Sequence, residues 1–115
     1  MIELELPYPP SVNHYYRHVG PRTLISRRGR EYRARVCALM RSMNIHPLDG
    51  DIEMVIDLYP PDHRKRDLDN AMKAIWDSIQ KGGGYYDDSQ IKHCDAYMRE
   101  PMKPNGKAIV RIQQL

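Results

Sequence analysis

The chain has 115 residues, of which 18 are basic and 15 acidic, and its formal net charge is +3. This length and a hydrophobic content of 41% predict one globular domain spanning residues 1–115. No apolar run approaches the roughly 18 residues of a membrane span, and the acidic, alternating N-terminus is not a signal peptide. The two cysteines, Cys37 and Cys94, match no metal-ligand spacing, so we expect reduced thiols in a cytoplasmic protein with no membrane partner.

The first half of the chain predicts a strand, a loop and a helix. Apolar and acidic residues alternate over residues 2–6, which indicates a half-buried strand that the following prolines end. Residues 11–25 are predicted to form a loop with a short hairpin around Gly20. Ser26 can cap the next helix. The apolar stripe of that helix lies opposite most of its arginines and consists of Tyr32, Val36, Leu39, Met40 and Met43.

The second half predicts three strands and one helix. Apolar residues at every second position mark a strand over residues 52–58, and two further strands are expected at residues 90–98 and 107–114. A helix is predicted from about Asp69 to Gln80, ended by a run of glycines. Its buried stripe is Leu68, Met72, Ile75, Trp76 and Ile79. The order of elements predicts an α/β (α+β) fold: a two-layer domain with a mixed β-sheet and two helices.

The most informative motif is R-D-L-D-N at residues 66–70, directly after the basic run H-R-K. In an extended segment, Asp67 and Asp69 would project to the same side and could bind one ion. Hard oxygen ligands without a nearby histidine or cysteine favour Mg²⁺ or Mn²⁺. The basic run next to them favours a polyanion, so the motif points to phosphodiester chemistry on nucleic acid. The structural alternative is that the two acids merely cap a helix.

A second acidic pair, Asp87-Asp88, could complete this site. The predicted helix is about 18 Å long, and the six residue steps that follow it span at most about 20 Å. Asp88 can therefore return to Asp69 only along a tight path, or else a second subunit completes the site. Lys73 lies one turn after Asp69 and could stabilise charge on a phosphate, although its spacing alone favours an ordinary surface ion pair.

The charge is distributed unevenly. Residues 17–35 contain seven arginines and one acid, giving +6, so the rest of the chain carries −3. Such polarity fits a protein that grips a polyanion with one face, and a solvated helix face is the alternative. Arginines flank Tyr15 and Tyr16, whose rings could stack on unpaired bases or could instead pack on the sheet.

Four segments together resemble the RusA family of Holliday junction resolvases, which occurs in bacteria, prophages and phages. They are L-P-Y-P-P-S-V-N at residues 6–13 with Tyr15, Tyr16 and Arg17, then residues 26–32, residues 64–70 with Lys73, and Y-D-D-S-Q at residues 86–90. The resemblance implies a RusA-like fold and a homodimeric, Mg²⁺-dependent endonuclease, with Mn²⁺ as a substitute. Such an enzyme binds four-way DNA junctions and nicks opposing strands symmetrically during DNA recombination and repair.

The resemblance also assigns residues. The family's catalytic aspartates, which we expect to be metal ligands, map onto Asp67, Asp69 and Asp88, and its essential lysine maps onto Lys73. The expected DNA-binding residues are Asn13, Tyr15, Tyr16, Arg17, Arg27, Arg28, Arg64, Lys65 and Arg66. Action is expected in the cytoplasm of a bacterium or a phage-infected cell.

Three other functions remain open at this point. A junction-binding protein without cleavage would share the arginine surface, and a small metal-dependent ribonuclease would also cluster acids. A structural phage protein could use the arginine-rich helix for assembly, and this hypothesis predicts no metal dependence.

Overall fold

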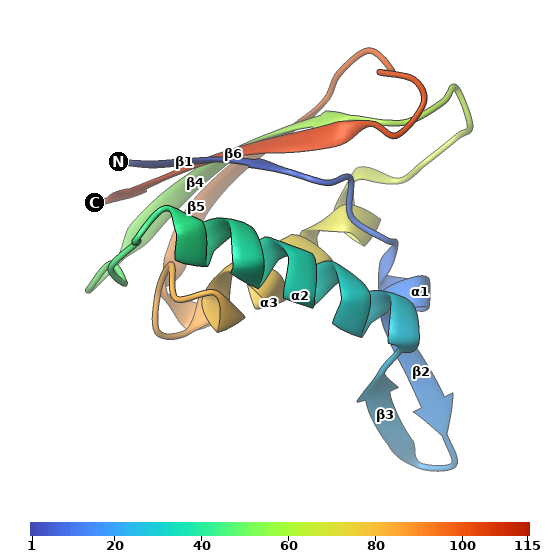
Figure 1. Cartoon of the computed structure of the whole chain (residues 1–115), viewed down its shortest axis with the longest axis horizontal. Helices are drawn as coiled ribbons and strands as arrows, with labels where there is room; N and C mark the ends of the chain where they lie inside the picture. Colours follow the sequence, from blue (N-terminus) through green and yellow to red (C-terminus); the bar gives the residue numbers. More distant parts are fainter.

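The computed structural model describes all 115 residues. Two long helices lie side by side across one face of a four-stranded sheet, and a small hairpin projects from the far end of the helical layer (Figure 1). The elements, in chain order, are β1 (Ile2–Leu6), α1 (Val12–Tyr15), β2 (Tyr16–Val19), β3 (Arg22–Ile25), α2 (Arg27–Ser42), β4 (Ile52–Tyr59), the 3₁₀ turn η1 (Leu68–Ala71), α3 (Met72–Lys81), the 3₁₀ turn η2 (Asp88–Gln90), β5 (Ile91–Met98) and β6 (Lys107–Gln114). The predicted two-layer α/β fold is confirmed.

The sheet is mixed, as the sequence predicts. Its strand order is β1-β6-β4-β5, with β4 parallel to β5 and the other neighbours antiparallel. Every second residue of β4, from Ile52 to Leu58, is fully buried toward the helices. This alternation places the hydrophobic core between the sheet and the two helices, because successive side chains of a strand point to opposite faces.

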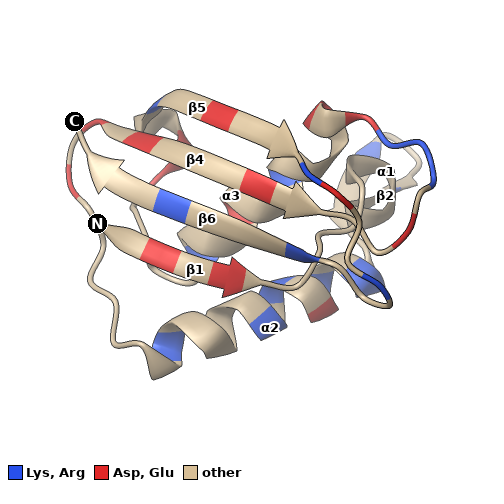
Figure 2. Ribbon diagram, turned by 90° about the horizontal axis from the view of Figure 1, so that it is seen from above, with Lys and Arg blue, Asp and Glu red and all other residues tan.

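The other face of the sheet carries no helix and mixes acidic with basic residues (Figure 2). Asp57, at its centre, accepts from Arg99 at 2.6 Å and from Arg111 at 3.2 Å. Lys107 pairs with Glu5 at 3.0 Å. Because these charges neutralise one another across the strands, this face offers a polyanion little net attraction.

Helix α2 begins where the sequence predicts. The Ser26 hydroxyl accepts from the Gly29 backbone N–H at 3.0 Å, which is a capping bond. Tyr32, Val36 and Met40 form its buried face.

No helix of the chain is both long and apolar enough to cross a bilayer.

The predicted buried stripes are partly wrong. Leu39 is 41% exposed because it lies at the margin of the face centred on Val36. Met43 is 50% exposed because it is the C-cap, beyond the last turn of α2. Leu68 is also exposed, since it belongs to η1 rather than to α3.

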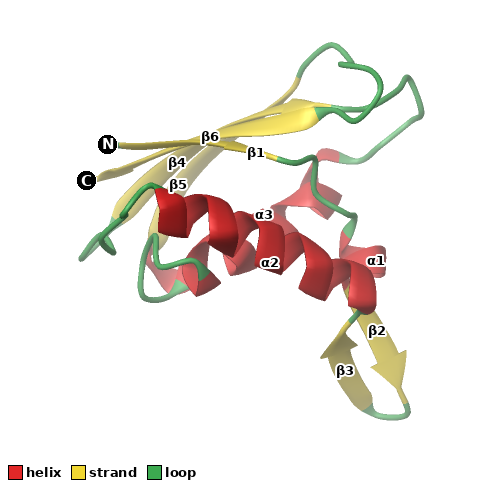
Figure 3. Cartoon of the chain, in the orientation of Figure 1, coloured by secondary structure: helices red, strands yellow, loops and turns green.

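The hairpin predicted around Gly20 is confirmed. Strands β2 and β3 pair in register and extend away from the body of the domain (Figure 3), and Gly20 makes their turn at a φ of +59°. Residues 12–15 were expected in a loop but form the short helix α1, which ends on the buried Tyr15.

Candidate active site and nucleic-acid interface

Asp67 and Asp69 lie where the loop after β4 turns into η1. Both are exposed, and Asp67 occupies the N-cap position of η1, but its side chain makes no capping hydrogen bond. The nearest basic side chains are engaged elsewhere: Arg66 pairs with Asp62 at 2.8 Å, and Lys73 pairs with Asp88 at 3.4 Å. The two carboxylates are therefore left without a cationic partner.

An apolar hollow of about 530 Å³ opens beside these two acids. Asp67 and Asp69 contribute its polar part, and the other lining residues are Leu68, Met72, Trp76, Cys94 and Ala96. Carboxylates next to apolar walls interact more strongly with a cation than fully hydrated ones do.

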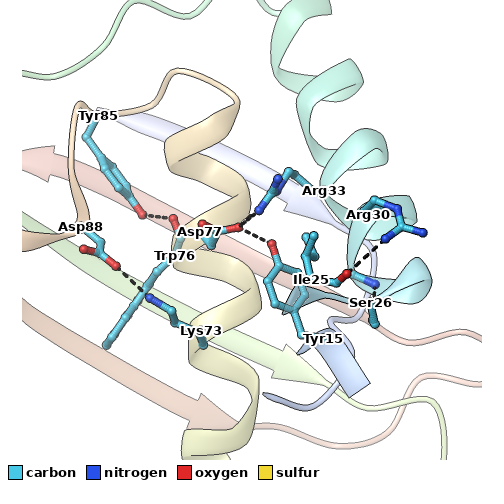
Figure 4. Close-up of polar contacts among 11 residues, drawn as sticks. Tyr15, Ile25, Ser26, Arg30, Arg33, Lys73, Trp76, Asp77, Tyr85 and Asp88 are labelled. Atoms are coloured by element: carbon cyan, nitrogen blue, oxygen red, sulfur yellow. Dashed lines mark hydrogen bonds and ion pairs between the residues drawn. The ribbon is translucent and has the colours of Figure 1, made fainter. Parts of the chain in front are cut away.

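Asp88 does return along α3 within a single chain. Gly83 adopts a φ of +88°, and the Gly84 backbone N–H then donates to the Ile79 carbonyl at 3.0 Å. The Asp88 backbone N–H donates to the Gln80 side chain at 3.1 Å. Its carboxylate consequently reaches the Lys73 ammonium (Figure 4).

Gly84→Ala is expected to destabilise this return. A Cβ at position 84 would lie 2.6 Å from Ile79 Cγ2 and 3.2 Å from the Met40 side chain. Overpacking of this kind costs about 1–3 kcal/mol in free energy of unfolding, which urea denaturation would measure. An unchanged urea midpoint would mean that the turn after α3 can accommodate the added methyl group.

The electrostatics of Lys73 favour a permanent cation. Burial alone would lower the pKa of its ammonium, but the Tyr16 phenol and the Asp88 carboxylate outweigh burial and raise that pKa above its ordinary value. A protonated lysine cannot act as a base at neutral pH. It can stabilise an anion, which is the role that a phosphodiester reaction offers.

A second, polar hollow of about 800 Å³, called the basic cleft from here on, adjoins the first, and Asp67 lines both. Segments far apart in the sequence meet there: the proline-rich segment after β1, the start of α2, the loop after β4 and the turn before β6. The predicted residues Arg28, Arg64, Lys65 and Arg66 line it. Sequence reasoning missed its other polar members, which are Tyr8, Ser11, His14, Asn70 and Asn105.

Comparison with known proteins identifies the family. The family model described as "Endodeoxyribonuclease RusA" matches residues 7–113. This chain belongs to the RusA family. A relative named "Crossover junction endodeoxyribonuclease rusA" from Enterobacteria phage 82 is 43% identical over 113 residues, covering 97% of this chain and 93% of the relative. Relatives of the same name from Escherichia coli K12 and Shigella sonnei are 39% and 40% identical with the same coverage.

The three predicted metal ligands of this RusA-family chain are only partly brought together. Asp67 and Asp69 share the apolar hollow, whereas Asp88 faces Lys73, and no three acidic, histidine or cysteine side chains are grouped closely enough to hold an ion. The two unpaired carboxylates nevertheless offer the hard oxygen donors that a divalent cation such as Mg²⁺ prefers. The donor chemistry of Asp67 and Asp69 therefore fits a divalent cation, whereas Asp88 pairs with Lys73.

The structure contradicts base stacking by Tyr15, which the neighbouring arginines suggested, and favours the packing alternative. Tyr15 is fully buried, and its hydroxyl donates to Asp77 on α3, so its ring cannot stack on a base. Burial and the Asp77 hydrogen bond raise the pKa of Tyr15 to about 12. Tyr16 is half-buried with its ring edge-on to that of Tyr15.

The other predicted DNA-binding side chains differ in their exposure and in the ion pairs that they form. Asn13, Arg17, Arg28 and Lys65 are exposed, and the Arg64 side chain is 83% exposed although its Nε lies 3.7 Å from an Asp62 carboxylate oxygen. Arg27 is exposed but forms an ion pair with Glu31 at 3.1 Å. Arg66 is the most constrained, since it also donates to two backbone carbonyls and lies over the Tyr8 ring. Its Asp62 partner has a pKa lowered to about 2, chiefly by their hydrogen bond.

Proposed function

We propose that this chain is a crossover junction endodeoxyribonuclease. It resolves four-way DNA junctions by paired, symmetric nicks, in recombination and repair. The observation that carries the proposal is the position of Asp67, which borders both the basic cleft and the hollow that it shares with Asp69. A phosphate backbone held by arginines in the cleft would run directly onto the carboxylates. The names of the relatives support the same activity.

The cofactor is proposed to be Mg²⁺, with Mn²⁺ as a substitute. Asp67 and Asp69 would hold it, with Asp88 as the third ligand. When bound, such an ion polarises a phosphoryl oxygen and lowers the pKa of a bound water. Arg64 and Lys65 hold the DNA backbone beside the acids, and Lys73 stabilises negative charge on the phosphate or on the leaving 3′ oxygen.

The active species is proposed to be a homodimer. A junction has paired arms, and a two-fold dimer presents two identical sites to two strands. A monomer would nick once and leave the junction joined. The substrate is DNA, so the cytoplasm of a bacterial or phage-infected cell is the proposed compartment. Sedimentation with a bound junction should give two chains per junction, and one chain per junction would contradict the dimer.

A synthetic, mobile four-way junction tests the activity. Symmetric nicks that need Mg²⁺, disappear with EDTA and are absent from linear duplex would support the resolvase. Tight junction binding without cuts under any divalent metal would favour a pure binding protein. Equal cleavage of single-stranded RNA would favour a ribonuclease, and no nucleic-acid binding at all would favour a structural protein.

Two arginines of the cleft are expected to govern the salt dependence of binding. Arg28→Ala and Arg64→Ala should each weaken junction binding and reduce the slope of log K against log salt by about 1, because each removes one phosphate contact. Arg41→Ala is the matched control, since Arg41 is exposed near the other end of α2 and outside the cleft. Slopes equal to the wild-type slope would contradict phosphate contact at these positions.

A further inference from the structure

Asp77 on α3 lies at the centre of a polar cluster that the proposed chemistry does not use. Arg33 of α2 donates to its Oδ2 atom from Nη2 at 2.8 Å and from Nε at 3.2 Å. The Tyr15 hydroxyl, at the end of α1, donates to the same oxygen (Figure 4). One carboxylate oxygen thus joins three helices that are distant in sequence. The Asp77 and Arg33 side chains are 17% and 30% exposed, so solvent competes weakly for these bonds.

The β2–β3 hairpin is attached to the rest of the domain at its base, next to Tyr15. Its first strand follows Tyr15 directly, and its last strand ends beside Ser26, whose backbone N–H donates to the Tyr15 carbonyl at 2.8 Å. Arg30 donates to the Ile25 carbonyl at 3.1 Å. These contacts are at the base, whereas Gly20 at the tip has open space around it. The direction of the hairpin is therefore set at Tyr15.

The same helix carries Lys73. Asp77 follows Lys73 by four residues, so the two side chains project from the same side of α3, one turn apart. Lys73 pairs with Asp88, and Asp77 holds Tyr15, whose ring packs edge-on against Tyr16 with 5.0 Å between ring centroids. Helix α3 thus carries both the predicted catalytic lysine and the aspartate that holds Tyr15 at the base of the hairpin.

We propose that Asp77 is a positioning residue that, clamped by Arg33, anchors the Tyr15 hydroxyl and fixes the β2–β3 hairpin relative to Lys73. The functional part rests on the proposed nuclease activity. The exposed Arg17 on β2 then meets a DNA strand in a fixed direction with respect to the lysine. Loss of the anchor leaves the basic residues present but misdirected, which lowers the cleavage rate of the bound complex more than it lowers affinity.

Two nearly isosteric variants test this proposal without DNA. Tyr15→Phe deletes only the hydroxyl, and Asp77→Asn deletes the charge. Trypsin cuts after arginine, and the hairpin offers Arg17 and Arg22 as sites. Both variants should be cut in the hairpin about tenfold faster than wild type, because local opening there becomes easier. The matched controls are Tyr97→Phe and Asp51→Asn, which change exposed side chains far from the cluster.

Single-turnover cleavage supplies the second measurement. At saturating junction, both variants should cut about tenfold more slowly than wild type, with a dissociation constant within about threefold. Hairpins as resistant to trypsin as the wild-type hairpin, with only a lower melting temperature, would overturn the proposal and leave the cluster a core contact. A wild-type chain that cuts no junction would sink the proposed function instead, and the trypsin result would still decide whether Asp77 anchors the hairpin.

Discussion

Asp69→Asn is expected to lower the rate of junction cleavage by about 1000-fold or more while leaving junction binding intact. The substitution keeps the shape of the side chain but removes one of the two carboxylates that border the apolar hollow. A divalent ion loses a charged ligand there. The DNA backbone meets less negative charge, so affinity should stay equal to that of the wild type or increase. Gel-shift titration and single-turnover cleavage measure the two quantities separately.

Calorimetric titration of the free protein with Mn²⁺ gives a readout that needs no DNA. The wild-type chain should bind the ion, and Asp69→Asn should bind it at least tenfold more weakly. Asp51→Asn is the control, because Asp51 is exposed and lies outside both hollows. If Asp69→Asn cuts junctions at the wild-type rate, the acids are not part of a nuclease site, and the binding-protein alternative returns.

The fold was largely predictable because its strongest signals are local. The alternation in β4 and the capping serine of α2 each place an element from a few neighbouring residues. Helix α1 was not predictable in this way. It has four residues, too few for helix propensity to matter, and it forms because Tyr15 is drawn into the core and hydrogen-bonds a residue 62 positions away.

In the candidate site, too, local motifs were predictable from the sequence and long-range contacts were not. Asp67 and Asp69 belong to one motif, so sequence alone could nominate them. The hollows could not be foreseen, because Tyr8 and Asn105 meet in one of them only after β1 and the turn before β6 are placed by the sheet. Tyr15 shows the converse error: an aromatic residue beside arginines suggests base stacking, yet burial gives it a structural role.

The position of Asp88 was the open geometrical question, and chain length did not decide it. The return along α3 depends on a left-handed Gly83 and on the close approach of Gly84 to Ile79, neither of which is visible as a distance in the sequence. The result is that Asp88 contacts Lys73 rather than lying among the other acids. The Lys73 ammonium lies 3.4 Å from that carboxylate, and a bound phosphate would compete with Asp88 for it.

Lys73→Ala is expected to slow cleavage of a bound junction by about 100-fold and to weaken binding less than about threefold. The lysine has one ion-pair partner, Asp88. Removing the lysine takes a cation from beside the reacting phosphate and leaves Asp88 as a third acid without a cationic partner. Both changes oppose the build-up of negative charge in the transition state more than they oppose binding, because Arg28, Arg64 and Arg66 line the cleft in which we propose that the DNA backbone binds.

The matched control for Lys73→Ala is Lys92→Ala, since Lys92 is exposed on β5 and outside both hollows. A pH series sharpens the test. The pKa of Lys73 lies above its ordinary value of 10.5, so its charge persists from pH 7 to 9. Raising the pH over that range should therefore not reproduce the loss seen in Lys73→Ala. Equal losses of cleavage and binding in the variant would reduce Lys73 to an ordinary DNA contact. A selective loss of cleavage would instead mark it as a charge that acts in the transition state.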